Sequence, residues 1–305
     1  MRLDDLPESS NIEDRREEGG GFGGFGGLPG GRGGLGIGTV VVLGLVGWAL
    51  GIDPRLLIGG AELISGGSPY ETQAPVRNRP TGTPQDEMGR EVSKILGSTE
   101  VVWKDIFAKD GKTYRAPTLV MYSGSTEARC GAAQSAMGPF YCPIDEKVYL
   151  DASFFRELQT RFRGCDAGSR SCLFAQSYVI AHEVGHHVQK LLGILPRVQQ
   201  QQQAAQGKAA ANHLQVEVEL QADCFAGVWA NRSQERWKEL EPGDVDAALR
   251  TASAIGDDTL QRQAQGRVVP DSFTHGTSAQ RQRWFNSGFK GGTVASCNTF
   301  GATQL

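Results

Sequence analysis

The stretch Ala175–Gly193, AQSYVIAHEVGHHVQKLLG, contains the pattern that decides the fold. His182 and His186 are four residues apart, so on a helix both imidazoles project from one face, one turn apart. The residues around them are mostly apolar, which predicts a largely buried helix. We expect this helix to end at Gly193, with Pro196 shortly beyond it.

Two imidazoles at this spacing can hold one zinc ion, and Glu183 would then lie beside the metal, where it can take a proton from water. The short His-Glu-x-x-His motif is weak alone, and histidines satisfied in a core are the alternative. A catalytic zinc needs a third protein ligand and one open position. The metzincin solution is excluded, because the chain has Gln189 and Leu192 where that motif needs Gly and His.

The other solution is a glutamate from a following helix, which the sequence predicts over 212–232. Glu219 is the better candidate and Glu217 the alternative. Asp223 lies one turn beyond Glu219 on the same face, so its carboxylate could accept a hydrogen bond from a ligand imidazole. Apolar neighbours disfavour the reading of Glu219 and Asp223 as a solvated helix face.

The 305 residues allow one sizeable domain with appendages, and a net charge of −3 gives no reason to expect nucleic acid as a partner. None of the six cysteines forms a CxxC pair, so a structural zinc module is not indicated. Disulfides in an oxidising compartment are predicted, and buried free thiols are the alternative. The expected pairs are Cys130 with Cys142, Cys165 with Cys172, and Cys224 with Cys297.

The N-terminal region divides by composition. Residues 1–34 are charged and then glycine-rich, which predicts a disordered arm. Residues 35–52 carry no charge and predict one transmembrane helix, with a secretory signal peptide as the alternative. Arg15, Arg16 and Arg32 precede this segment and Arg55 follows it closely, so we expect the N-terminus in the cytoplasm and the domain outside it. Residues 53–85 are expected to be a linker and 86–305 the folded domain.

Periodicity predicts a mainly helical α+β domain with a small sheet. Expected helices cover 86–96, 151–162, 212–232, 242–255 and 278–289, besides the motif helix. Expected strands cover 118–122 and 147–150, and 101–107 fits either type. Residues 123–143 are expected to be a glycine-punctuated loop that could run as an extended edge near the cleft, and 199–211 a polar connection.

Four segments carry a resemblance: HEVGHHVQ, ELQADCFAGVWA, GPFYCP with VYLD, and SFTHGTSAQR. Together they resemble the neutral zinc metallopeptidase family of bacterial single-pass membrane proteins, over nearly the whole chain. The metal-binding pattern is also similar to that of the integral-membrane zinc proteases of the heat-shock and prenyl-protein type. The resemblance implies a zincin-like metallopeptidase domain, zinc as cofactor, and a peptide or protein as substrate.

His275 matches a histidine-containing segment that follows the third ligand in those larger proteases. It could donate a hydrogen bond to the oxyanion, alone or with Arg281 or Arg283; a loop histidine without such a role is the alternative. His187 and His213 are expected to be structural or solvent-facing.

The sequence therefore favours a membrane-anchored zinc endopeptidase, with His182, His186 and Glu219 as metal ligands and Glu183 as general base. Such donor sets also accept manganese or cobalt. The alternative is a non-catalytic envelope scaffold or binding protein that retains a structural zinc site. An intact Glu183 argues against the alternative, because a structural site has no need of a base.

Overall fold

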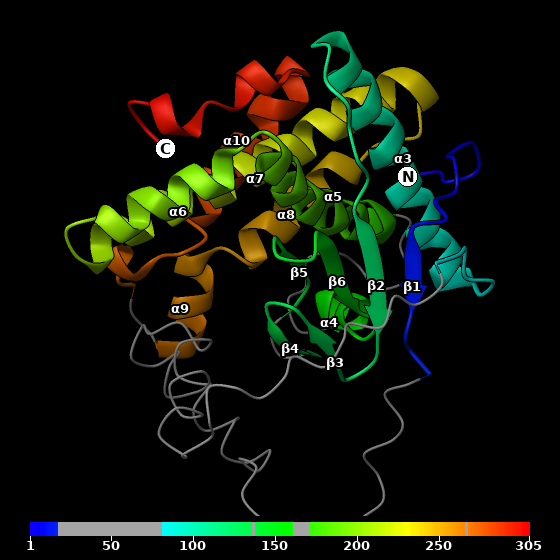
Figure 1. The fold of residues 1–305 in the computed structure, drawn as a ribbon, viewed down its shortest axis with the longest axis horizontal. Coiled ribbons are helices and arrows are strands. Elements are labelled where there is room, and N and C mark those ends of the chain that lie inside the picture. Colours follow the sequence, from blue (N-terminus) through cyan, green and yellow to red (C-terminus); the bar gives the residue numbers. More distant parts are fainter. Residues whose placement is uncertain (18–80, 136–137, 161–170, 266–267) are drawn as a thin grey trace, which may run out of the picture. The chain divides into compact units, whose positions relative to one another are not determined.

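The computed structural model of the protein describes residues 1–17, 81–135, 138–160, 171–265 and 268–305. These residues belong to one folded unit. It is an α+β fold, mainly helical with a small sheet, as the sequence predicts. In Figure 1 the helices α5, α7 and α10 lie together above the strands.

The main sheet has the strand order β1-β2-β6-β5, and Figure 1 shows these strands side by side. Strands β1 (Ile12–Asp14), β2 (Thr118–Tyr122) and β6 (Lys147–Asp151) are parallel, with Leu119 opposite Val148. Strand β5 (Phe140–Cys142) pairs antiparallel with β6. Strands β3 (Ser125–Ala128) and β4 (Gly131–Gln134) form a separate antiparallel hairpin. The predicted loop over 123–143 is thus largely extended structure.

Both faces of the main sheet are covered, and the alternation along each strand sorts the side chains. Leu119, Met121, Val148 and Leu150 join the large core that the helices share. Val120 and Tyr122, together with Tyr149, lie on the other face in a smaller cluster with Ala133 of the β3–β4 hairpin.

The central helices are α5 (Ser171–Leu191), α7 (Lys208–Trp237) and α10 (Ser278–Gly291). Glycines let their backbones approach closely. A Cβ on Gly185 of α5 would lie 3.0 Å from the carbonyl oxygen of Ala222, and one on Gly288 of α10 would overlap the carbonyl of Cys224. These contacts fix α7 between the motif helix and the C-terminal helix.

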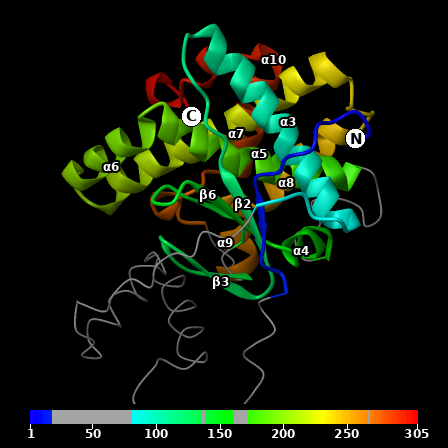
Figure 2. The ribbon, with the colours of Figure 1, turned by 45° about the vertical axis from the view of Figure 1, so that its right-hand side comes forward.

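The other helices of the described residues are α3 (Glu87–Lys109), α4 (Phe154–Thr160), α6 (Ile194–Ala204), α8 (Asp244–Ala254) and α9 (Asp257–Gln265). The C-terminal part also has short 3-10 turns, η3 (Pro270–Ser272), η4 (Val294–Cys297) and η5 (Thr299–Gly301). Figure 2 shows α6 lying along the N-terminal part of α7, where Ile194 and Val198 pack against Val218. The polar connection predicted over 199–211 is therefore mostly helical, and Pro196 stands in the first turn of α6.

The prediction of a disordered arm is wrong for residues 1–17. Met1, Leu6 and Ile12 are buried in the main core, so this charged segment contributes apolar area that its composition conceals. Its charges are also paired: Glu13 accepts from Lys147 and Arg15, which offsets the cost of burying its carboxylate. The linker prediction over 53–85 is wrong at its end, because the amide of Gly82 and the hydroxyl of Thr83 donate to backbone carbonyls of the N-terminal segment.

The β1–β2 ladder constrains the predicted membrane orientation. Residues 18–80 connect two strands that pair with each other, so β1 and β2 must lie on the same side of any membrane. A single crossing by residues 35–52 would put them on opposite sides and is incompatible with this ladder. Within the described residues, no helix has the length and apolar character needed to cross a bilayer. Residues 35–52 themselves lie outside the described residues.

Two of the expected disulfides are present. Cys130–Cys142 ties the β3–β4 turn to β5, and Cys224–Cys297 ties α7 to the C-terminal turn η4. The expected pair Cys165–Cys172 cannot be followed, because Cys165 lies outside the described residues.

Candidate functional site

Three side chains from two helices converge at one point. His182 and His186 come from successive turns of α5, and Glu219 comes from the facing turn of α7. Glu219 Oε2 lies 3.2 Å from His182 Nε2 and 3.5 Å from His186 Nε2. Among the described residues, these three form the group of histidine, cysteine and acidic side chains arranged to hold a metal ion.

The distances fit a zinc ion. Zinc bonds of about 2.0–2.1 Å at tetrahedral angles put neighbouring ligand atoms about 3.3 Å apart, close to the two separations measured here. The donor set of two imidazoles and one carboxylate is also one that catalytic zinc uses with a fourth position open to water. The site is nearly enclosed, since the side chains of all three residues are at most 13% exposed.

Glu183 follows the first of these histidines and is also buried, at 7% exposure. Its Oε2 has no hydrogen-bond partner within the described residues. Burial raises the pKa of this carboxyl, and the adjacent His182 and His186 offset part of that rise. A buried carboxylate oxygen without a partner is costly unless something else binds there. Water or a substrate group at this position would supply the missing partner.

A buried cluster of charged side chains holds His182 through its Nδ1 atom. Its Nδ1 lies 2.8 Å from Asp223 Oδ1, the contact expected from the one-turn spacing of Glu219 and Asp223. Asp223 accepts two further bonds from the Arg281 guanidinium, at 2.8 and 2.9 Å, and one from the Tyr178 hydroxyl. Burial favours the neutral acid, but Arg281 and His182 outweigh it and hold the pKa of Asp223 at about 2. The carboxylate therefore stays ionised and keeps Nε2 of His182 turned toward Glu219.

His186 has a different support. Its Nδ1 lies 2.9 Å from Oε1 of Gln189, one turn further along α5. Gln189 is fully buried and neutral. No spacing in the sequence relates Gln189 to a role at the site; its identity there only excludes a metzincin motif.

His275 lies on the segment between η3 and α10. Its side chain is 51% exposed, and its Nδ1 lies 3.3 Å from Asp257 Oδ1. Partial burial opposes protonation, but Asp257 and Glu219 raise the pKa of His275. The charge of His275 in turn lowers the pKa of Glu183 and of Glu219, which places it within electrostatic reach of both.

Asp257, which the sequence did not single out, holds this segment. Its Oδ2 accepts the backbone amides of Thr274, His275 and Gly276. The loop that carries His275 is therefore fixed by backbone hydrogen bonds, independent of the imidazole itself.

The other candidates lie elsewhere. Glu217 lies 3.9 Å from the exposed His213 rather than in the metal group. His187 is buried between the Tyr141 hydroxyl and the carbonyl of Arg115, which is a structural role. Arg281 is committed to Asp223, and the exposed Arg283 reaches the Leu305 carbonyl. Both arginines thus donate hydrogen bonds to groups outside the metal group.

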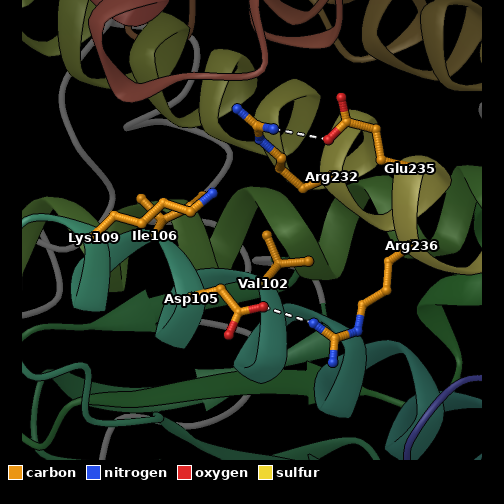
Figure 3. A pocket seen from close by; sticks show the side chains of 7 residues that line it. All are labelled: Val102, Asp105, Ile106, Lys109, Arg232, Glu235 and Arg236. Atoms are coloured by element: carbon orange, nitrogen blue, oxygen red, sulfur yellow. Dashed lines mark hydrogen bonds and ion pairs between the residues drawn. The ribbon is translucent and has the colours of Figure 1, made fainter.

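A groove of about 220 Å³ lies between α3 and the C-terminal end of α7 (Figure 3). Val102 and Ile106 lie along it, the ion pair Arg236–Asp105 crosses it, and the pair Arg232–Glu235 lies on its α7 side. It shares no residue with the metal group, and Arg232 is thirteen residues beyond Glu219, about 20 Å along the helix. No role is assigned to this groove.

Comparisons with known proteins agree with the geometry. The chain is 51% identical over 301 residues to "Uncharacterized protein YpfJ" of Escherichia coli K12, covering 99% of each. It is 44% identical over 217 residues to "Uncharacterized protein Rv2575" of Mycobacterium tuberculosis H37Rv, covering 68% of this chain and 69% of that protein. No solved structure matches the chain, so the expected zincin likeness stays a prediction. The family model described as "Putative neutral zinc metallopeptidase" matches residues 1–300, and the chain belongs to that family.

Proposed function

We propose that the protein is a zinc-dependent endopeptidase. The observation that carries this proposal is the convergence of His182, His186 and Glu219 at 3.2–3.5 Å beside a buried carboxylate, that of Glu183, with an unpartnered oxygen. A purely structural zinc site closes its coordination with protein ligands and needs no such carboxylate. This feature favours catalysis over the non-catalytic scaffold.

Each of these residues would have a separate role in the reaction. His182, His186 and Glu219 would hold the zinc ion. Zinc, when bound, would supply the positive charge that polarises a water molecule and the scissile carbonyl. Glu183 would accept a proton from that water and deliver it to the leaving amine, a role that its raised pKa suits. His275, half exposed and held by Asp257, would donate a hydrogen bond from Nε2 to the oxygen of the attacked carbonyl.

The test compares wild type with Glu183→Gln, which preserves the size of the side chain and removes the base. Wild type should cleave an unfolded protein such as reduced casein, and a zinc chelator should abolish the cleavage. Glu183→Gln should bind one zinc ion per chain and leave the casein intact. Cleavage by this variant at the wild-type rate would refute the general-base role.

The proposed membrane attachment through residues 35–52 must satisfy the β1–β2 ladder. Supported by that ladder, we propose that the N-terminal segment with β1 and the rest of the folded domain lie on the same side of the membrane. Thiols introduced at the exposed positions Asp4 and Lys290 should then react with an impermeant maleimide from the same side of the membrane. Labelling from opposite sides would contradict the proposed topology.

A further inference from the structure

We infer that Gln189 and Gln221 are positioning residues of the metal site. They form an amide relay that sets the orientation of His186 from the C-terminal turn η4. This inference rests on the proposed zinc site but not on peptidase activity. It begins with the contact between His186 Nδ1 and Gln189 Oε1 at 2.9 Å.

Backbone carbonyls determine which way each amide points. Gln189 Nε2 lies 2.8 Å from the carbonyl oxygen of Val218, which can only accept a hydrogen bond. The NH₂ end of Gln189 must therefore face α7, and its Oε1 must face His186. Since that oxygen can only accept, Nδ1 of His186 carries the proton, and Nε2 is left unprotonated toward Glu219.

Gln221 is the next residue of the relay, and a backbone carbonyl orients its amide in the same way. Gln189 Nε2 also donates to Gln221 Oε1 at 3.0 Å, and Gln221 Nε2 donates to the carbonyl oxygen of Cys297 at 2.9 Å. Cys297 is bonded to Cys224 of α7 by a disulfide. Both glutamines are buried, so their bonds do not compete with bulk water. The disulfide therefore holds the Cys297 carbonyl in place, and this carbonyl is the last acceptor in the chain of hydrogen bonds that starts at His186.

The two histidines are therefore oriented by unlike means. His182 depends on the charged cluster of Asp223 and Arg281, whereas His186 depends on neutral amides whose arrangement is independent of pH. Loss of the partner behind a metal-binding histidine typically weakens metal affinity by about 10–100-fold.

The test measures zinc affinity of the full chain by competition with a chromophoric chelator. Gln189→Leu should weaken zinc binding by about 10–100-fold, and Gln221→Leu should weaken it in the same direction. In the double variant, the loss of zinc-binding free energy should be smaller than the sum of the losses in the two single variants, because both residues act through one relay. Nitrogen NMR of the zinc-free single variants should show His186 leaving the Nδ1-protonated tautomer, which general destabilisation would not produce.

The two disulfides provide a matched comparison. Cys224→Ser with Cys297→Ser should weaken zinc binding, while Cys130→Ser with Cys142→Ser should leave it unchanged, because that bond lies on the far face of the sheet. Unchanged zinc affinity in Gln189→Leu, or strictly additive losses in the double glutamine variant, would overturn the relay. If wild type binds zinc but cleaves nothing, the proposed function fails and the relay stands. If wild type takes up no zinc, both fail.

Discussion

Replacing Arg281 by methionine tests the charged support of His182. Arg281 is 3% exposed and Asp223 is fully buried, and two hydrogen bonds of 2.8 and 2.9 Å join them. Methionine preserves most of the buried volume but leaves the Asp223 carboxylate without its main countercharge. Removing one partner of a buried ion pair costs about 3–5 kcal/mol, which agrees with two charged hydrogen bonds of about 1.5–3 kcal/mol each. In a domain of this size, the midpoint of thermal unfolding should fall by about 6–20 °C.

The assay is urea and thermal unfolding of the zinc-free protein with its disulfides intact. The matched control is Arg283→Met, two residues along the same helix, where the side chain is exposed and its bond to the Leu305 carbonyl is 3.4 Å long. That change should alter the free energy of unfolding by less than about 0.5 kcal/mol. Equal effects of the two substitutions would show that the pair does not stabilise the core, and the account of His182 would fail with it.

Three further predictions concern separate parts of the molecule. His275→Ala should lower turnover by about 100-fold while zinc affinity measured by chelator competition stays unchanged; unaltered turnover would remove the oxyanion role. Gly97→Val should destabilise the fold by about 1–3 kcal/mol in urea unfolding, because even a Cβ at Gly97 would lie 2.2 Å from the Pro7 carbonyl oxygen; Gly82→Ala, with open space around it, is the control. Burial raises the pKa of Glu13, but the bonds from Lys147 and Arg15 outweigh it, so the pKa lies below the ordinary 4.5. The contribution of this carboxylate to the free energy of unfolding is therefore present above that pH and is lost as the pH falls below it. The β1 amides should lose their protection from hydrogen exchange in acid before the α7 amides do. A simultaneous loss of protection would contradict this assignment.

The convergence of His182, His186 and Glu219 could be predicted because it depends on helix geometry. A four-residue spacing places two histidines on one helix face whatever the tertiary structure is. The one-turn spacing to Asp223 favours Glu219 over Glu217, and the structure turns Glu217 toward His213 instead. Asp223 followed from the same helical period.

Elements stabilised by distant contacts were missed. Residues 1–17 look disordered by composition, yet Ile12 pairs opposite Leu119, more than a hundred residues away in the chain. The glutamines and alanines after Val198 look like a spacer, although both residue types favour helices. The packing of Val198 on Val218 settles which reading holds. Charge density and low complexity describe exposed surface well, but they do not reveal which few apolar side chains the fold uses.

The residues that orient His182 and His186 could be predicted only in part. Arg281, Gln189 and Gln221 have no spacing that relates them to the motif, and their roles depend on how closely the helices pack. Gly185 against Ala222, and Gly288 against Cys224, bring α5, α7 and α10 near enough for polar side chains to connect them directly. A wider helix spacing would leave Asp223 beyond reach of Arg281, and Gln189 beyond reach of the Val218 carbonyl. The glycines in the packed helices are therefore as necessary to the orientation of the two imidazoles as the residues that contact them, although a glycine has no side chain to offer as a ligand.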